Sequence, residues 1–329
     1  MFEPKSGLRK IATIITVATI ASVISLGSVS EAASAAPNST LPNTVAFLKS
    51  AFTASDIQTR LTTGFALESL IQLAGAGITA GDLDAATVAE FTNPSLVLGN
   101  KKRPGYLMDS ATFTLKPGLT GKFLFASKVL KAPNPVKQAR LTASLDEIVK
   151  TDGGASASQG NAQDVAWVVL GLQSQSDLAS ARKAAAALMK MQLADGGFNY
   201  DPTLTTGGTD VTAIAIQALK SLNFATKASN TKRNSVVSKA VAFLKRTDVN
   251  NNHFEAWGDL DPNGTAYAIM GLQAAGQNVA PYATWLRGKV QADGGIEAPW
   301  AIGSGDRYVT AQGYLPLIGK TYLTLLAAI

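Results

Sequence analysis

The chain has 329 residues, of which 46% are hydrophobic and 16% charged, and it carries a formal net charge of +6. These proportions exclude an intrinsically disordered chain and a multi-span membrane protein, and they supply a large core. There is no cysteine and only one histidine, His253. Thiolate nucleophiles, Cys/His zinc sites and the usual serine–histidine relay are therefore excluded, and we expect neither a metal nor a cofactor.

The first 35 residues have the pattern of a secretory signal peptide. Basic residues between positions 5 and 10 precede an apolar stretch from Ile11 to Leu26, and Ala33-Ser34-Ala35 offers small residues for cleavage before Ala36. The stretch is too short and too rich in Thr and Ser for a stable membrane span, so we expect none in the mature chain. The protein is predicted to be secreted.

The positive charge of the mature chain is small and scattered. Cleavage after Ala35 leaves 26 Lys and Arg against 21 Asp and Glu, a net charge of +5. These basic residues are not interleaved with aromatic ones, as they are in proteins that bind single-stranded nucleic acid. Nucleic acid is not expected as a partner.

Three Asp-Gly-Gly turns reveal an internal repeat. They begin at Asp152, Asp195 and Asp293, so the first interval is 43 residues and the second 98. The longer interval is about two units of 49, which predicts a degenerate copy between them at 248–254. Glycine tolerates positive φ and Asp bonds to its own backbone, so each copy is expected to be a tight turn.

A nearly all-apolar run follows each turn and an amphipathic run precedes it. The apolar runs begin near residues 164, 210 and 263, with weaker copies near 64, 121 and 309. Helices that are apolar all round are buried on both sides, whereas amphipathic helices have one solvent face. We therefore expect about six helix pairs closed into an all-α (α/α)6 toroid over 42–329, after a short leader at 36–41. A hairpin-like insertion is expected within 100–119.

The segment Gln192-Leu193-Ala194-Asp195-Gly196-Gly197-Phe198, followed by Thr209-Asp210-Val211-Thr212-Ala213, resembles the prenyltransferase and squalene-cyclase repeat superfamily. That resemblance implies an α/α toroid of six helix pairs. The chain also resembles toroid binders of the transcobalamin and intrinsic-factor type, which hold a small molecule without a reacting residue.

The catalytic branches of this superfamily differ in the residues that they need. Protein prenyltransferases and thioester domains both use a cysteine, which the chain lacks. Class II terpene cyclases protonate an alkene with a carboxylic acid of an Asp-x-Asp-Asp motif. The nearest counterpart in this chain is Asp259-Leu260-Asp261-Pro262. Asp259 and Asp261 are therefore the catalytic candidates, although Asp261 is also well placed to cap a helix.

The candidate ligand-binding residues share a position near the predicted starts of the inner helices. Parallel inner helices would gather these starts around one opening, where aromatic and acidic side chains could line a pocket. The acids can equally cap helices, and the aromatics can equally belong to the core. The candidates are Asp164, Trp167, Asp210, Trp257, Tyr267, Trp300, Asp306 and Tyr308.

These features favour a secreted toroid that binds a small apolar, isoprenoid-like or cobalamin-like ligand without catalysis of a known type. Two alternatives remain open. The first is an enzyme, either a divergent terpene cyclase or a carbohydrate-active toroid with a pair of carboxylates across a cleft. The second is an extracellular interaction protein whose barrel is filled. The single His253 is expected to be a solvated loop residue.

Overall fold

The computed structural model describes residues 41–50, 64–100, 102–133 and 138–329. The chain divides into two units, residues 1–34 and 35–329, and all of these described residues belong to the second. The proposed signal peptide at 1–35 lies outside the described residues, as does the leader apart from Leu41. No helix in the described part of the chain is both long and apolar enough to cross a membrane.

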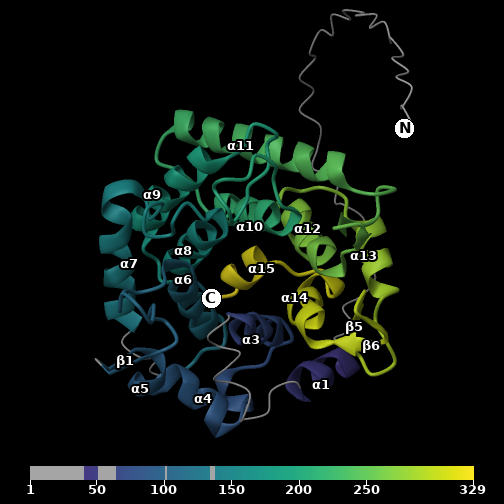
Figure 1. Ribbon diagram of the computed structural model, residues 1–329, viewed down its shortest axis with the longest axis horizontal. Helices are drawn as coiled ribbons and strands as arrows, with labels where there is room; N and C mark the ends of the chain where they lie inside the picture. Colours follow the sequence, from purple (N-terminus) through teal and green to yellow (C-terminus); the bar gives the residue numbers. More distant parts are fainter. Residues whose placement is uncertain (1–40, 51–63, 101, 134–137) are drawn as a thin grey trace, which may run out of the picture. The chain divides into compact units, whose positions relative to one another are not determined.

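Six inner helices form a closed ring (Figure 1). In chain order they are α3 (Phe65–Gly75), α6 (Pro117–Val129), α8 (Ala162–Ser174), α10 (Thr209–Lys220), α12 (Pro262–Ala274) and α14 (Arg307–Leu317). Each packs against the next, and α14 packs against α3 to close the circle. The regions around Val165 and Val211 are helical, as expected. The predicted (α/α)6 toroid is confirmed.

An outer helix precedes each inner helix along the chain. These outer helices are α1 (Pro42–Ser50), α4 (Ala85–Thr92), α7 (Gln138–Asp152), α9 (Leu178–Leu188), α11 (Lys227–Thr247) and α13 (Ala280–Arg287). Shorter helical turns lie at Ala80–Asp82, at α5 (Pro94–Val97) and at Met189–Met191. The outer helices bury one face only. In α7, for example, only Leu141, Leu145 and Val149 are buried.

Two of the three Asp-Gly-Gly turns, at Asp195 and Asp293, tie their loop to the start of the following inner helix, whereas the Asp152 carboxylate accepts from Gly154 and Ser156 within its own turn. Both carboxylate oxygens of Asp195 accept backbone N–H bonds, from Gly197 and from Gly207, each at 2.8 Å. Asp293 repeats this arrangement with Gly295 and Gly305 at 2.9 Å. The glycines leave room for the close approach, because a Cβ at Gly197 would lie 2.7 Å from the Gly207 Cα.

The degenerate copy keeps a second feature of the repeat. The N–H of Phe254 donates to the Thr265 hydroxyl at 3.0 Å, just as Phe198 donates to Thr212 at 2.9 Å. The slot predicted at 248–254 is therefore a true repeat in structure, although its Gly-Gly pair is lost. In each case a threonine in the first turn of the inner helix fixes the turn that precedes it.

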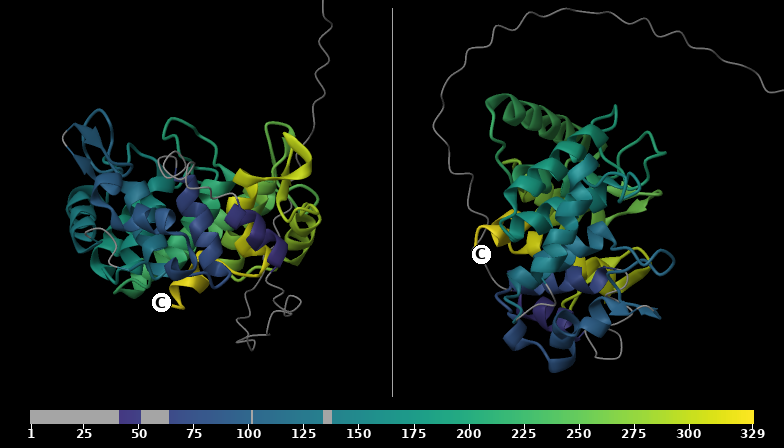
Figure 2. Two further views of the ribbon diagram at one scale, coloured as in Figure 1. Left: turned by 90° about the horizontal axis from the view of Figure 1, so that it is seen from below. Right: turned by 90° about the vertical axis from the view of Figure 1, so that its left-hand side faces the viewer.

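Short antiparallel hairpins join several helices. They are β1 (Gly99–Asn100) with β2 (Arg103–Pro104), β3 (Glu255–Ala256) with β4 (Asp259–Leu260), and β5 (Ile296–Ala298) with β6 (Ala301–Asp306). The first overlaps the beginning of the hairpin-like insertion expected at 100–119, and an isolated antiparallel bridge between Met108 and Leu115 lies inside that segment. Figure 2 shows hairpins and loops that precede inner helices on one face of the ring, with the C-terminus on the opposite face. The starts of the inner helices therefore share that loop-rich face.

The last helix fills the centre of the ring at the face opposite the loops. Helix α15 (Tyr322–Leu326) lies inside the circle of inner helices (Figure 1). The backbone N–H of Tyr322 donates to Gln217 near the end of α10, and its hydroxyl donates to Glu68 near the start of α3. The Tyr322 side chain thus runs along the ring axis and closes the interior from the face opposite the loops.

Candidate functional site

A cavity of about 600 Å³, which we call the mouth cavity, opens where the inner helices begin. It joins a smaller hollow of about 250 Å³, the Asp164 pocket, and the two share Gly64, Lys122 and Gln163 as lining residues. The mouth cavity is also lined by Phe65, Tyr267, Asp306, Arg307, Tyr308 and Gln312. The Asp164 pocket adds Lys116, Gly118, Leu119, Asp164 and Trp167. Aromatic, amide and charged side chains therefore converge at one opening.

A buried ion pair lies beneath this opening. The Lys122 ammonium is 2.8 Å from a carboxylate oxygen of Glu68, whose side chain is fully buried. The same ammonium lies 4.6 Å from the centre of the Trp167 ring, a favourable cation–π distance. Two charges placed on otherwise apolar inner helices compensate each other, which reduces the cost of taking each out of water.

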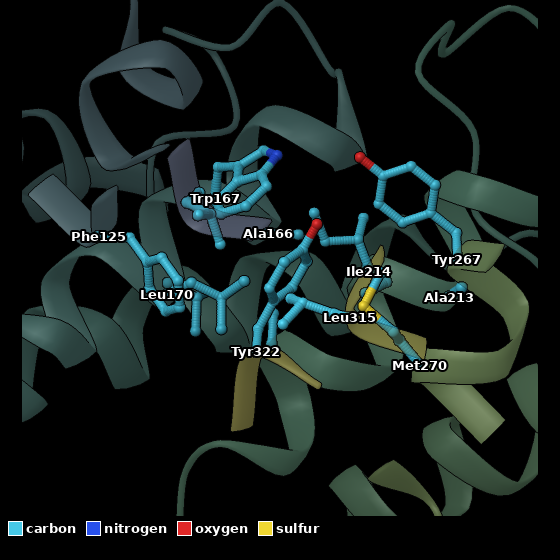
Figure 3. Close-up of a cluster of buried hydrophobic side chains, with 14 of the residues drawn as sticks. Phe125, Ala166, Trp167, Leu170, Ala213, Ile214, Tyr267, Met270, Leu315 and Tyr322 are labelled. Carbon is cyan, nitrogen blue, oxygen red and sulfur yellow. The ribbon is translucent and has the colours of Figure 1, made fainter. Parts of the chain in front are cut away.

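Aromatic side chains build the floor of the cavities, as Figure 3 shows. The Tyr322 ring packs 5.1 Å from Trp167 and 5.8 Å from Phe125. Burial raises the pKa of the Tyr267 and Tyr322 hydroxyls well above the ordinary value, and the Glu68 charge adds to the effect. Both hydroxyls therefore stay neutral and can donate or accept hydrogen bonds.

The Trp167 indole N–H is a buried donor with no acceptor among the described residues. In Figure 3 this nitrogen and the Tyr267 hydroxyl point toward each other across the space above Tyr322. An unpaired buried donor is costly, so an acceptor supplied by a ligand would stabilise the site.

Asp164 occupies the first turn of α8 but does not cap it. That role belongs to Asn161, whose side-chain oxygen accepts from the backbone N–H groups of Gln163 and Asp164. Asp164 instead packs against α6 at Gly118, where a Cβ would lie 2.1 Å from its carboxylate. Burial raises the pKa of Asp164 to about 6, partly offset by the Lys122 charge. The side chain can thus hold or release a proton near neutral pH.

Two more acids lie at the starts of the next two inner helices: Asp210 is the second residue of α10, and Asp261 is the N-cap of α12. Burial raises the pKa of both, and the charge of Asp210 raises that of Asp261 further. Asp261 caps α12 by accepting from the Gly264 N–H at 2.8 Å. Neither acid lines the mouth cavity or the Asp164 pocket.

Tyr308 and Asp306 form the rim on the α14 side. The half-exposed Tyr308 ring stacks on Phe65 at 5.7 Å, with an angle of 13° between the rings. Burial raises the pKa of the Tyr308 hydroxyl. Asp306 caps α14 through the Val309 N–H at 2.9 Å, and its other oxygen accepts the indole N–H of Trp300 at 2.8 Å.

The structure thus brings together five of the candidates from the sequence, namely Asp164, Trp167, Tyr267, Asp306 and Tyr308. Trp300 is bonded to this group through Asp306. Trp257 lies on the β3–β4 turn and is 99% exposed, and Asp259 is exposed on β4 beside it. Neither of these two lines a cavity described above.

Sequence reasoning missed several lining residues and the ion pair below them. Lys122 and Glu68 interrupt inner-helix runs that are otherwise apolar, and that interruption was an available signal. The expectation for His253 was wrong. Its side chain is buried and its ring stacks on Trp285 at 4.9 Å, with Nε2 3.5 Å from Glu255. The β3–β4 hairpin follows directly, so the loop is packed rather than solvated.

Within the described residues, no three acidic, histidine or cysteine side chains are grouped closely enough to hold a metal ion. The basic side chains that line the mouth cavity are Lys122 and Arg307.

The closed ring of helix pairs defines the chain as an α/α toroid protein. No family model matches the sequence, and no curated protein matches it. Among solved structures, the fold is similar to unsaturated glucuronyl hydrolase from Bacillus sp. GL1, which is responsible for the degradation of glycosaminoglycan. The TM-score is 0.52 and the identity 13%, over 87% of this chain and 94% of that one. This similarity supports the α/α toroid fold alone, and it does not show membership of the prenyltransferase and squalene-cyclase superfamily.

Proposed function

We propose that the protein binds a carbohydrate in the mouth cavity and the Asp164 pocket. The observation that carries this proposal is the mixture of flat aromatic faces and hydrogen-bonding side chains around one opening. A sugar ring has an apolar face of C–H groups and a rim of hydroxyls, so it needs both kinds of partner. The stacked pair Tyr308 and Phe65 offers the first, and Gln163 and Gln312 offer the second.

Two further observations support a sugar ligand over a wholly apolar one. Lys122, Asp306 and Arg307 line the mouth cavity, and an isoprenoid chain has no polar groups to offer these charged side chains, whereas a sugar has several hydroxyls. The apolar interior below is occupied by Tyr322. The fold neighbour is named for a reaction on a glycan, which agrees with this choice.

We propose in addition that the protein cleaves the bound glycan, with Asp164 as the catalytic acid. Its pKa of about 6 favours this second proposal, because a carboxylic acid must be protonated to act as a proton donor. Asp164 would give its proton to the glycosidic oxygen as the bond to the sugar carbon breaks. Water would add to that carbon and lose its proton to a second carboxylate, for which Asp306, the other acid that lines these two cavities, is the candidate.

The proposal includes secretion, since the N-terminal pattern suits export and glycans are abundant outside cells. The binding test also distinguishes this proposal from its alternatives, which are an isoprenoid-like ligand, a cobalamin-like ligand and an extracellular protein partner. A polyprenyl phosphate that bound more tightly than any glycan would favour the isoprenoid-like ligand instead.

Calorimetric titration of the protein with neutral, amino and acidic oligosaccharides tests binding, and reducing-end assays on the same sugars test cleavage. Asp164→Asn should keep the affinity and abolish turnover. Asp259→Asn is the matched control, because Asp259 is an exposed acid that lines neither cavity, and it should alter neither. Unaltered turnover in Asp164→Asn would end the catalytic part. Failure of every glycan to bind would end the whole proposal.

A further inference from the structure

The Asp164 pocket continues into a third hollow. This hollow, which we call the side cavity, has a volume of about 550 Å³ and shares Lys116 and Asp164 with the Asp164 pocket. It extends away from the ring axis to Asp109 and to Tyr200 and Pro202 in the loop before α10. The side cavity, the Asp164 pocket and the mouth cavity therefore adjoin in sequence, each sharing lining residues with the next.

The two ends of this series lie on opposite sides of the ring. The side cavity adjoins the start of α8 through Asn161 and Asp164. The mouth cavity ends at Asp306 and Tyr308, at the start of α14. Since the inner helices follow the order α3, α6, α8, α10, α12 and α14 around the circle, α8 and α14 face each other. The three hollows thus form one groove across the loop-rich face.

An exposed aromatic residue stands at each end of the groove. Tyr200 lines the side cavity and is 55% exposed. At the opposite end the Trp300 ring is 67% exposed, and its indole N–H is bonded to Asp306, which lines the mouth cavity. Large aromatics left open to water at both ends of a polar groove are unfavourable for the free protein and suit a ligand that covers them.

Both aromatics are carried by fixed backbone. The loop of Tyr200 is attached to α8 by the bond from the Ala162 N–H to the Asn199 carbonyl, at 3.2 Å. The Asn199 side chain donates back to the Thr206 carbonyl at 2.7 Å. Trp300 sits between the paired strands β5 and β6. Groups already held in place lose little conformational freedom on binding, so they contribute to affinity.

We infer that the groove takes a chain of linked sugar units lying across the ring, with Tyr200 and Trp300 as stacking platforms for the outermost units. This inference rests on the proposed carbohydrate function and adds the substrate class, a glycan polymer or long oligosaccharide rather than a single sugar. Asp164, between the side and mouth cavities, then faces an internal linkage of the chain, so that cleavage occurs within the polymer.

The test compares short and long members of one glycan series. Binding of a disaccharide and of the matching octasaccharide is measured by calorimetry for the parent protein, Tyr200→Ala and Trp300→Ala. The parent should bind the longer chain more tightly. Each variant should lose about tenfold in affinity for the octasaccharide, the scale of one stacking contact, and little for the disaccharide.

Trp257→Ala is the matched control, because Trp257 is an almost fully exposed tryptophan on a hairpin that lines none of the three cavities. It should change neither affinity, and thermal melting should confirm that all three variants fold. Equal affinity for both chain lengths, or an octasaccharide affinity unchanged in Tyr200→Ala and Trp300→Ala, overturns the extended groove while leaving the proposed function intact. Absence of binding by any glycan removes both.

Discussion

Asp164 should lower the stability of the folded protein at neutral pH, and its replacement by Asn should raise it. In an unfolded chain the carboxyl has a pKa of 3.8, whereas burial raises it to about 6 in the folded protein. The folded state therefore binds a proton between these values that the unfolded state releases. The free energy of unfolding therefore falls as pH rises from about 3.8 to about 6. Above this range it is lowered by the full cost of ionising the buried carboxyl, and below it Asp164 is protonated in both states and costs nothing.

The size of the effect follows from the two pKa values. A difference of about 2 pKa units, from 3.8 to about 6, corresponds to about 3 kcal/mol, since each unit is worth about 1.4 kcal/mol. Asn has nearly the same shape and is uncharged throughout. Asp164→Asn should therefore gain up to about 3 kcal/mol over the parent at about pH 8, and the gain should vanish at about pH 3.

Urea denaturation of both proteins across this pH range measures the difference directly, and other titrating groups cancel in the comparison. Asp84→Asn supplies a control of opposite sign. A backbone hydrogen bond from Thr87 holds the pKa of Asp84 below its ordinary value, so this variant should lose stability as pH rises above the acid range. An Asp164→Asn protein that is less stable than the parent at high pH, or a difference independent of pH, would refute the reasoning.

Three further outcomes are expected in denaturation experiments. Gly121→Ala should cost about 1–3 kcal/mol of unfolding free energy, because the added Cβ would lie 2.3 Å from the Trp167 carbonyl oxygen where α6 and α8 cross. Gly81→Ala is the control: its Cβ would meet nothing closer than 3.6 Å, and it should change stability by less than about 0.5 kcal/mol. Asp195→Ala should cost about 1–3 kcal/mol of unfolding free energy and loosen the loop before α10 in hydrogen exchange, since it removes the acceptor of the part-buried Gly197 and Gly207 N–H groups. Lys122→Met should cost about 3–5 kcal/mol by leaving Glu68 buried and uncompensated, and the double variant with Glu68→Gln should recover most of the loss.

The fold was predictable because the repeat is local. The hydrogen bonds of the Asp195 turn have partners at most 14 residues away, so the repeat remains visible in the sequence. The degenerate copy near Phe254 could be placed from spacing alone, and the structure shows that it keeps the hydrogen bond to a helix threonine. Helix α15 carries no repeat pattern, and the role of Tyr322 inside the ring depends on partners about 100 to 250 residues away in the chain.

The candidate site was only partly predictable, for the same physical reason. Trp167 and Trp257 are both tryptophans close to inner-helix starts, yet one is buried beneath the cavities and the other stands open on a hairpin. Their difference is set by whether a neighbouring helix covers them, which a single sequence does not record. Asp164 lies inside the first turn of α8, which Asn161 caps, whereas Asp261 is itself the cap of α12.

The most direct test of the account is a crystal structure of the protein soaked with an oligosaccharide that it binds. Sugar rings should lie across the loop-rich face between Tyr200 and Trp300, with a polar contact to Asp164 and an acceptor on the Trp167 indole N–H. Sugar density on the outer helices, or a mouth cavity that stays empty while ligand binds elsewhere, would contradict the account.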